Sequence, residues 1–258
     1  MTTLLLHGLG ADRRQPLDLF GPVLAGGATV IAPDVRGHGA SGVTGDPADF
    51  DLDRLADDVT REALSRPDGA GDGHPFTVVG ISMGAAIALR ILLRGLLPIE
   101  RAVFVRPAFT DEPLPQNLRA FPVIGQLLAD LGAVAGEDAF RRTALFERTR
   151  VESRLGAAGL LSQFRSTDAA ARAVRLVEIP RNRAFDFDAE LAAVAGGAHP
   201  TRTMVVAAPR DPVHPEAVAE RWADSLGADL LRVPARDDGA PAHASAMREA
   251  VDGWLDAH

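Results

Sequence analysis

The sequence predicts an α/β fold, with a mainly parallel sheet of about six strands and a helical cap inserted into it. Apolar, β-rich runs alternate with helical patterns up to residue 106 and again from residue 201. Such alternation favours a parallel sheet with helices on both faces. Residues 107–200 show helical patterns and no convincing strand. We therefore predict a core of residues 1–106 and 201–258 and a helical cap over residues 107–200.

Six apolar runs are typical of strands. They cover residues 2–6, 28–33, 76–79, 101–105, 203–208 and 230–233.

Helical patterns fill the intervals between the strands. The helix that opens near residue 51 has acidic residues in its first turn and an apolar stripe formed by Leu52, Leu55, Val59 and Leu64. The other helices of the core are expected over residues 12–25, 83–94, 215–226 and 244–256, and those of the cap over residues 118–131, 137–146, 160–164 and 167–177. Seven of the 11 phenylalanines lie in the cap.

Composition excludes several classes of function. With 47% hydrophobic and 24% charged residues, the chain has the balance of a soluble globular protein. A net charge of -8 disfavours nucleic acid as a partner. The absence of cysteine excludes thiolate chemistry, and the absence of lysine excludes Schiff bases. We find neither a leader nor a membrane-length apolar run, and expect a cytoplasmic protein with a small-molecule substrate and no membrane partner.

Residues 80–84 read Gly-Ile-Ser-Met-Gly, between a β-rich run and an alanine-rich helical pattern. Gly-x-Ser-x-Gly is the nucleophile-elbow pattern, in which a serine occupies a strained turn and needs glycines two positions to either side. The turn places Ser82 at the amino end of a helix, where N–H groups and the helix dipole favour developing negative charge. A plain glycine-flanked turn is the alternative. The strand before it and the helix after it favour Ser82 as a nucleophile.

Three motifs in a fixed order resemble the α/β-hydrolase superfamily. They are His-Gly-Leu-Gly at residues 7–10, Asp-Val-Arg-Gly-His-Gly-Ala-Ser at residues 34–41, and the elbow. The resemblance implies an α/β-hydrolase fold similar to the helical-cap esterases and lactonases, with the cap over the nucleophile. One departure is that the chain lacks residues for the first hairpin of the family's sheet. By the resemblance, residues 29–33 are then left at an edge of the sheet, where unpaired backbone groups invite pairing with a neighbouring chain. A homodimer joined at this edge is one hypothesis.

The resemblance implies a catalytic triad in the chain order serine, acid, histidine. Asp211 lies just beyond a strand end, and His243 lies after the last strand, where the family places its base. We therefore predict the triad Ser82, Asp211 and His243. Asp111 is a rival acid, and the histidines that compete with His243 are His199, His214 and His258. The context Ala-Pro-Ala-His also lacks the Gly-His that the family often shows.

A tetrahedral intermediate needs two donors for its oxyanion. By the resemblance, these are the backbone N–H groups of Met83, after the nucleophile, and of Leu9, in the His-Gly loop. Asp34, Arg36 and His38 are expected to be mainly structural, with local pairing of charges. No cofactor or metal is implied, because no cluster of residues has the spacing of metal ligands.

Arg106 follows a strand end and has two interpretations. A guanidinium facing the cleft favours a substrate with a carboxylate. An ordinary ion pair is the commoner alternative.

These observations predict a serine hydrolase that cleaves a carboxylic ester or lactone of a small to medium apolar molecule through an acyl-enzyme. Hydrolysis of a carbon–carbon bond, thioester cleavage and acyl transfer use the same machinery and remain alternatives. From another class, a weakly catalytic ligand-binding protein, or a lyase or cyclase on the same fold, also remains open.

Overall fold

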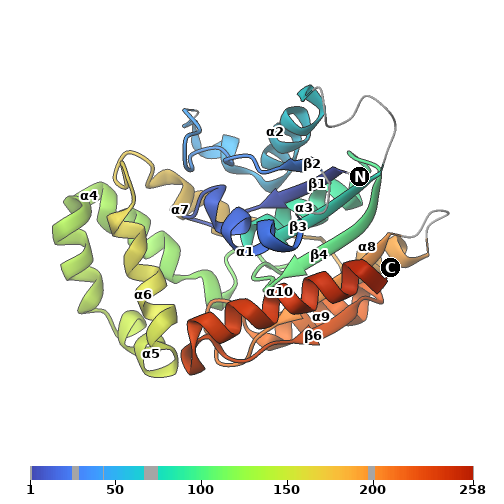
Figure 1. Ribbon diagram of the computed structural model, residues 1–258. Helices are drawn as coiled ribbons and strands as arrows, with labels where there is room; N and C mark the ends of the chain where they lie inside the picture. Colours follow the sequence, from blue (N-terminus) through green and yellow to red (C-terminus); the bar gives the residue numbers. More distant parts are fainter. Residues whose placement is uncertain (1, 25–28, 43, 67–74, 197–200, 258) are drawn as a thin grey trace.

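The computed structural model describes residues 2–24, 29–42, 44–66, 75–196 and 201–257 of the chain. Its centre is a six-stranded sheet in the order β2-β1-β3-β4-β5-β6, in which every neighbouring pair of strands is parallel. The strands are β1 (Thr2–Leu6), β2 (Thr29–Ile31), β3 (Phe76–Ile81), β4 (Ile99–Val105), β5 (Arg202–Ala207) and β6 (Asp229–Arg232). The predicted fold class is confirmed (Figure 1).

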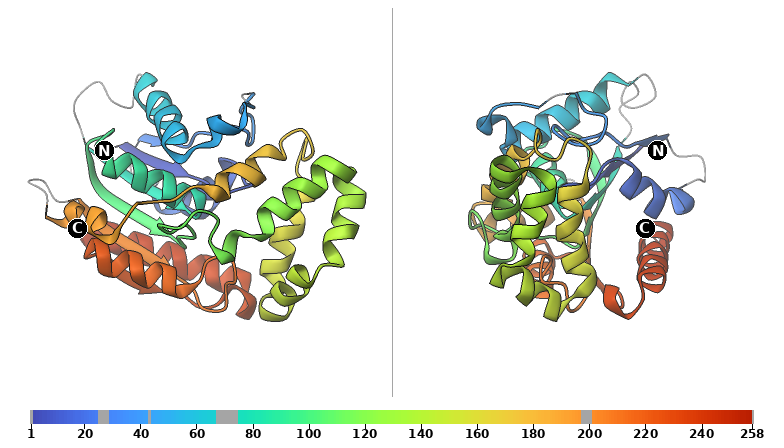
Figure 2. Two further views of the ribbon diagram at one scale, coloured as in Figure 1. Left: turned by 180° about the vertical axis from the view of Figure 1, so that it is seen from behind. Right: turned by 90° about the vertical axis from the view of Figure 1, so that its left-hand side faces the viewer.

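Five helices pack directly on this sheet. They are α1 (Arg14–Leu24), α2 (Leu52–Ser65), α3 (Met83–Leu93), α9 (Glu216–Leu226) and α10 (Ala240–Ala257). The right-hand view of Figure 2 shows α1 and α10 together on one side of the sheet. The other three cover the opposite side, as crossover connections between parallel strands require.

Alternation along the strands builds a separate core on each face of the sheet. Leu4 and Leu6 of β1 belong to the core under α2, α3 and α9, whereas Leu5 between them belongs to the core under α1 and α10. All three leucines are fully buried. A strand buried on both faces needs an unbroken apolar run, and this is why β1 lacks the polar alternation of a half-exposed strand.

The helical insertion follows β4 and contains α4 (Ala120–Arg141), α5 (Ala144–Glu152), α6 (Arg154–Ser162) and α7 (Val174–Glu178). Figures 1 and 2 show α4, α5 and α6 standing beside one end of the core. Short 3₁₀ turns at Gln116–Leu118, Gln163–Arg165 and Ile179–Arg181 connect these helices. The next helix, α8 (Asp188–Ala195), packs against α9 and α3 of the core although it lies within residues 107–200.

Helix α4 is unusually long and apolar. Together with the 3₁₀ turn before it, residues Gln116–Arg141 satisfy the length and hydropathy of a membrane span. Gly132, with φ of 73°, breaks the helix in its second half, and Ile124, Leu128 and Phe140 pack into the protein core. Helices of soluble proteins pass the same test, so the absence of a membrane partner stays a prediction.

Strand β2 forms one edge of the sheet and is only three residues long. Its edge position was predicted from the sequence. Short edge strands offer little backbone for pairing with another chain. The homodimer hypothesis stays a prediction.

Candidate active site

Ser82 sits at the turn between β3 and α3, in a conformation that few residues adopt. Its φ of 55° and ψ of -109° lie outside the common regions for L-residues. Such strain persists only where the surrounding structure enforces it, and it marks functional positions. The strand, tight turn and helix that the elbow pattern predicts are all present.

The two glycines of the elbow are required by close backbone packing. A Cβ atom at Gly80 would lie 2.3 Å from the carbonyl oxygen of Gly84, and a Cβ atom at Gly84 would lie 2.4 Å from that of Leu6. Both distances are far below van der Waals contact. Any side chain at either position would therefore push α3 away from the sheet.

The base that contacts Ser82 is His214. Its Nε2 lies 2.9 Å from the Ser82 Oγ, and its Nδ1 lies 2.9 Å from Oδ2 of Asp211. With the proton on Nδ1 donated to the carboxylate, Nε2 is free to accept the hydroxyl proton. Ser82 and Asp211 thus meet as predicted, but the histidine between them differs from the predicted one.

His243 does not occupy the predicted position, and the start of α10 explains why. The helix begins at Ala240 instead of residue 244, so His243 lies in its first turn and not in the preceding loop. Its Nδ1 lies 2.7 Å from the carbonyl oxygen of Pro234, and its side chain is buried. No hydrogen bond links it to Ser82 or Asp211 within the part of the chain that the structure describes. This placement corrects the predicted triad.

A local turn positions the acid and the base together. Oδ1 of Asp211 accepts the backbone N–H groups of Val213 and His214, each at 3.1 Å, in the manner of an Asx turn. The sequence signal for His214 was its position three residues after Asp211, in the run Asp-Pro-Val-His that forms this turn. The Asn117 amide, at the start of the cap, fixes this turn by donating to the carbonyls of Val213 at 2.7 Å and Ala108 at 2.9 Å.

Arg106, at the end of β4, pairs with Asp211. Its Nη1 donates to Oδ2 of Asp211 at 3.2 Å, and both side chains are about seven-eighths buried, with exposures of 12% each. Of the two interpretations drawn from the sequence, the structure shows the ion pair. This pair holds the carboxylate that orients His214.

Burial and these neighbours set the charges of the site. Burial alone would raise the pKa of Asp211, but His214, Arg106 and the backbone N–H of His214 outweigh it and hold that pKa well below its ordinary value. Burial lowers the pKa of His214; Asp211 opposes the shift, while Arg106 and Arg236 add to it. The acid is therefore ionised and the histidine neutral at neutral pH, as general-base catalysis requires.

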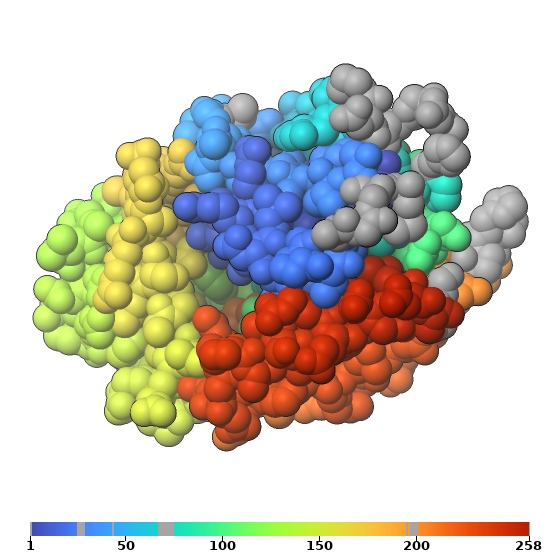
Figure 3. Space-filling view, viewed as in Figure 1, coloured from blue at the N-terminus to red at the C-terminus, as the bar shows by residue number. Residues whose placement is uncertain are grey.

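A cavity of about 190 Å³ opens onto Ser82 between core and cap. Its walls include Leu9, Phe121, Leu160 and Val213, with Gln163, Arg106 and Arg236 as polar members. Figure 3 shows a recess where the blue amino-terminal segment, the yellow part of the cap and the red helix α10 meet. The cavity is small and of mixed polarity.

The predicted oxyanion donors lie next to this cavity. Leu9 belongs to the loop after β1 and lines the cavity together with Ser82. Met83 is the first residue of α3, and the first N–H groups of a helix have no intrahelical acceptor. The role of these two N–H groups stays a prediction, supported by the loop and helix positions that it requires.

The remaining candidate residues have local partners or lie elsewhere. Asp34 accepts the backbone N–H groups of Arg13 at 2.7 Å and Ala40 at 2.8 Å, in keeping with the expected structural role. Arg36 pairs with Asp58 at 2.7 Å. The rival acid Asp111 is bound by Arg221 at 2.8 Å. The rival bases His199 and His258 lie outside the described residues.

Within the described ranges, no group of three or more histidine and carboxylate side chains is placed to hold a metal ion.

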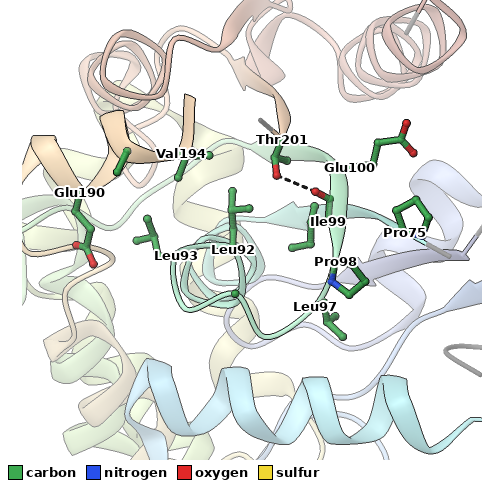
Figure 4. Close-up of a pocket in the computed structure, with 12 residues that line it drawn as sticks. Pro75, Leu92, Leu93, Leu97, Pro98, Ile99, Glu100, Glu190, Val194 and Thr201 are labelled. Carbon is green, nitrogen blue, oxygen red and sulfur yellow. Dashed lines mark hydrogen bonds between the residues drawn. The ribbon is translucent and has the colours of Figure 1, made fainter. Parts of the chain in front are cut away.

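A larger, mainly apolar cavity of about 830 Å³ lies near the amino ends of β3 and β4, bordered by Leu92, Pro98, Ile99 and Val194 (Figure 4). It contains none of the predicted catalytic residues.

A parallel sheet carrying a strained serine at the β3–α3 turn, with an Asp-His pair at the end of β5, defines the class of α/β hydrolases. The model of the alpha/beta hydrolase family matches residues 3–253, and the chain belongs to that family. None of the curated proteins compared with the chain matches it.

Solved structures support the fold at low sequence identity. MenH from S. aureus is 16% identical with a TM-score of 0.74, over 99% of this chain and 93% of that one. The enol-lactonase from Burkholderia xenovorans LB400 is 22% identical with a TM-score of 0.70, over 99% of this chain and 91% of that one. A thermophilic esterase from Thermogutta terrifontis is 17% identical with a TM-score of 0.68, over 99% of this chain and 89% of that one. At these identities, the likeness establishes the fold alone.

Proposed function

We propose that the protein is a serine hydrolase that cleaves a carboxylic ester or lactone through an acyl-enzyme. The observation that carries the proposal is the continuous hydrogen-bond chain from the Ser82 hydroxyl through the His214 ring to the Asp211 carboxylate, with two contacts of 2.9 Å. A serine hydroxyl is a weak nucleophile until a neighbouring base accepts its proton. This chain supplies the base and fixes its tautomer.

In the proposed mechanism, Oγ of Ser82 attacks the substrate carbonyl while Nε2 of His214 takes its proton. Asp211 stabilises the resulting imidazolium through Nδ1. The N–H groups of Leu9 and Met83 are proposed to bind the oxyanion. His214 then returns the proton to the leaving alkoxide, and the acyl-enzyme forms. Water, deprotonated by His214, hydrolyses it by the same steps in reverse order.

The cavity supports a substrate with a small acyl part. A volume of about 190 Å³ is below the range of drug-sized sites, and Phe121, Leu160 and Val213 give it an apolar wall. Among the structural neighbours, the printed titles name one an enol-lactonase and another an esterase, which agrees with ester or lactone chemistry for this chain.

Cleavage of thioesters or carbon–carbon bonds and acyl transfer remain alternatives because they use the same serine, base and oxyanion donors. A protein that binds its ligand with little turnover, or a lyase or cyclase, is the alternative from another class. A panel of small esters, lactones and thioesters ranks these alternatives by kcat/KM. Saturable binding without turnover would favour the binding protein.

The decisive experiment uses S82A. Wild-type protein is expected to hydrolyse p-nitrophenyl acetate or butyrate and to be labelled by a fluorophosphonate at Ser82, and S82A is expected to lose both properties. Circular dichroism and thermal unfolding verify that S82A is folded. Turnover and labelling that persist in folded S82A would refute the proposed function.

A further inference from the structure

Five arginines line one cavity between the core and the cap, on the far side of the loop at residues 8–11 from Ser82. The cavity has a volume of about 570 Å³, and its arginines are Arg13, Arg14, Arg165, Arg172 and Arg175. We call it the arginine cavity. In Figure 3 the blue segment of the core meets the yellow segment of the cap along this border.

Three of these arginines are paired with carboxylates. Arg13 pairs with Asp34 at 2.8 Å, and Arg14 pairs with Asp12 at 2.6 Å. Arg165 reaches Glu137 of α4 at 2.6 Å. Glu137 is shared with Arg141, so it balances the charge of Arg165 only in part. Because each of the three already has a carboxylate partner, they do not by themselves indicate a ligand.

Arg172 and Arg175 are held differently, by neutral oxygen atoms. Arg172 donates from Nη1 to the carbonyl of Gly39 at 2.8 Å. Arg175 donates to the carbonyl of Gly37, and its Nη2 lies 3.4 Å from the Ser166 hydroxyl. In the described ranges, neither side chain has a carboxylate within ion-pair distance. Two positive charges in this cavity are thus left uncompensated.

The burial of Arg175 makes this lack of compensation costly. The residue is only 3% exposed, and its Nε is buried with no partner among the described residues. Burial, with a contribution from Arg172, lowers the pKa of Arg175 to about 10. A buried charge with neither a counter-ion nor full hydrogen bonding is strongly unfavourable. An anion in the cavity would remove this penalty.

We propose that the arginine cavity binds a phosphate-type anion, with Arg172 and Arg175 as its main ligands. Guanidinium groups bind phosphate through parallel, charge-assisted N–H bonds, and Thr167 in the same lining adds a hydroxyl donor. The carboxylates of Asp12 and Asp34 also line the cavity, but each already accepts from an arginine.

The phosphate has two possible sources, which share this chemistry. Gly10 and Ala11 line both the arginine cavity and the cavity at Ser82. An acyl substrate with a phosphorylated tail could therefore place its carbonyl at Ser82 and its phosphate between the arginines. This first source rests on the proposed function. The second source is a separate phosphorylated molecule that binds as an effector, and it is independent of the proposed function.

Binding is tested with inorganic phosphate by calorimetry and thermal unfolding, at constant ionic strength maintained with chloride. The wild-type protein is expected to bind phosphate saturably and to unfold at a higher temperature with it. Arg172→Gln is expected to weaken binding by about tenfold or more, since a charge-assisted bond is lost. Arg175→Gln tests the second ligand, provided that it folds. Arg150→Gln is the matched control, because Arg150 is a half-exposed cap residue paired with Glu147.

Absence of saturable phosphate binding, or equal binding by folded R172Q and wild type, would overturn the proposal. S82A should bind phosphate normally, so that this result stands even if the proposed hydrolase activity fails. The sources are separated by comparing two carboxylic esters, 1-butyryl-glycerol 3-phosphate and 1-butyryl-glycerol. A substrate tail predicts a lower KM for the phosphorylated ester, and it predicts that R172Q removes this difference in KM. An effector site predicts equal KM values.

Discussion

His214 lies 2.9 Å from the hydroxyl of Ser82 and comes only three residues after Asp211. The proposed acid and base therefore belong to one turn at the end of β5, while the nucleophile comes from the end of β3. An acid and a base in one short turn keep their mutual geometry when neighbouring elements shift. Such a shift would change only the distance between His214 and Ser82.

Replacing each histidine with alanine distinguishes the proposed base, His214, from His243, the base expected from the sequence. H214A is expected to lower kcat/KM for a p-nitrophenyl ester by about 10³-fold or more, because the serine loses its base. H243A is expected to retain activity within about tenfold, since the side chain bonds only to Pro234 in the described structure. Strong loss in H243A, with full activity in H214A, would restore the original assignment.

The pH dependence follows from the lowered pKa of His214. Only the neutral imidazole accepts the serine proton, so activity falls as the pH drops through this pKa. Because burial shifts it below 6.5, the acid limb of kcat/KM is expected to have its midpoint below pH 6.5. The same shift makes the protein more stable as the pH rises towards 6.5, because the unfolded chain then binds more protons. A midpoint of the acid limb of kcat/KM above pH 7 would contradict the lowered pKa of His214.

Replacing Arg106 is expected to move that midpoint. The positive charge of Arg106 lowers the pKa of His214, so R106M should raise it and shift the acid limb to higher pH, by roughly one unit or less. KM for a neutral ester should change little, because the guanidinium pairs with Asp211. R61M, which removes an exposed arginine paired with Asp58, is the control. An unchanged pH profile with a raised KM for anionic substrates alone would favour direct substrate binding.

The elbow glycines predict a strong effect on stability. G84A places a Cβ atom 2.4 Å from the Leu6 carbonyl oxygen and is expected to lower the free energy of unfolding by about 2 kcal/mol or more. G253A in α10 is the matched control. A Cβ atom there meets nothing within 4 Å, and alanine favours a helix over glycine by about 1 kcal/mol. Urea unfolding measures both changes, and equal stabilities would contradict the packing argument.

The sequence predicted the features that depend on local pattern. The buried strands, the elbow and the helical insertion follow from apolar runs, glycine spacing and the order of motifs. The order of motifs could not exclude His243, because its exclusion depends on where α10 begins, and the short spacing from Asp211 to His214 was the local signal that favoured His214. Ala240 and Pro241 start the helix four residues earlier than expected, and a proline is tolerated in a first helical turn. That start removes His243 from the loop in which a base would reach the serine.

The amide of Asn117 joins the first turn of the insertion to the carbonyl of Val213 in the Asp-His turn. Replacing the cap with that of another protein would therefore remove the Asn117 hydrogen bond that holds the turn carrying His214, and would also change the walls of the cavity. Chimeras that keep residues 108–118 from this chain should preserve turnover better than those that exchange the whole insertion. In this chain, exchange of the whole cap is therefore expected to lower the rate as well as to change specificity, because the Asn117 contact is lost with it.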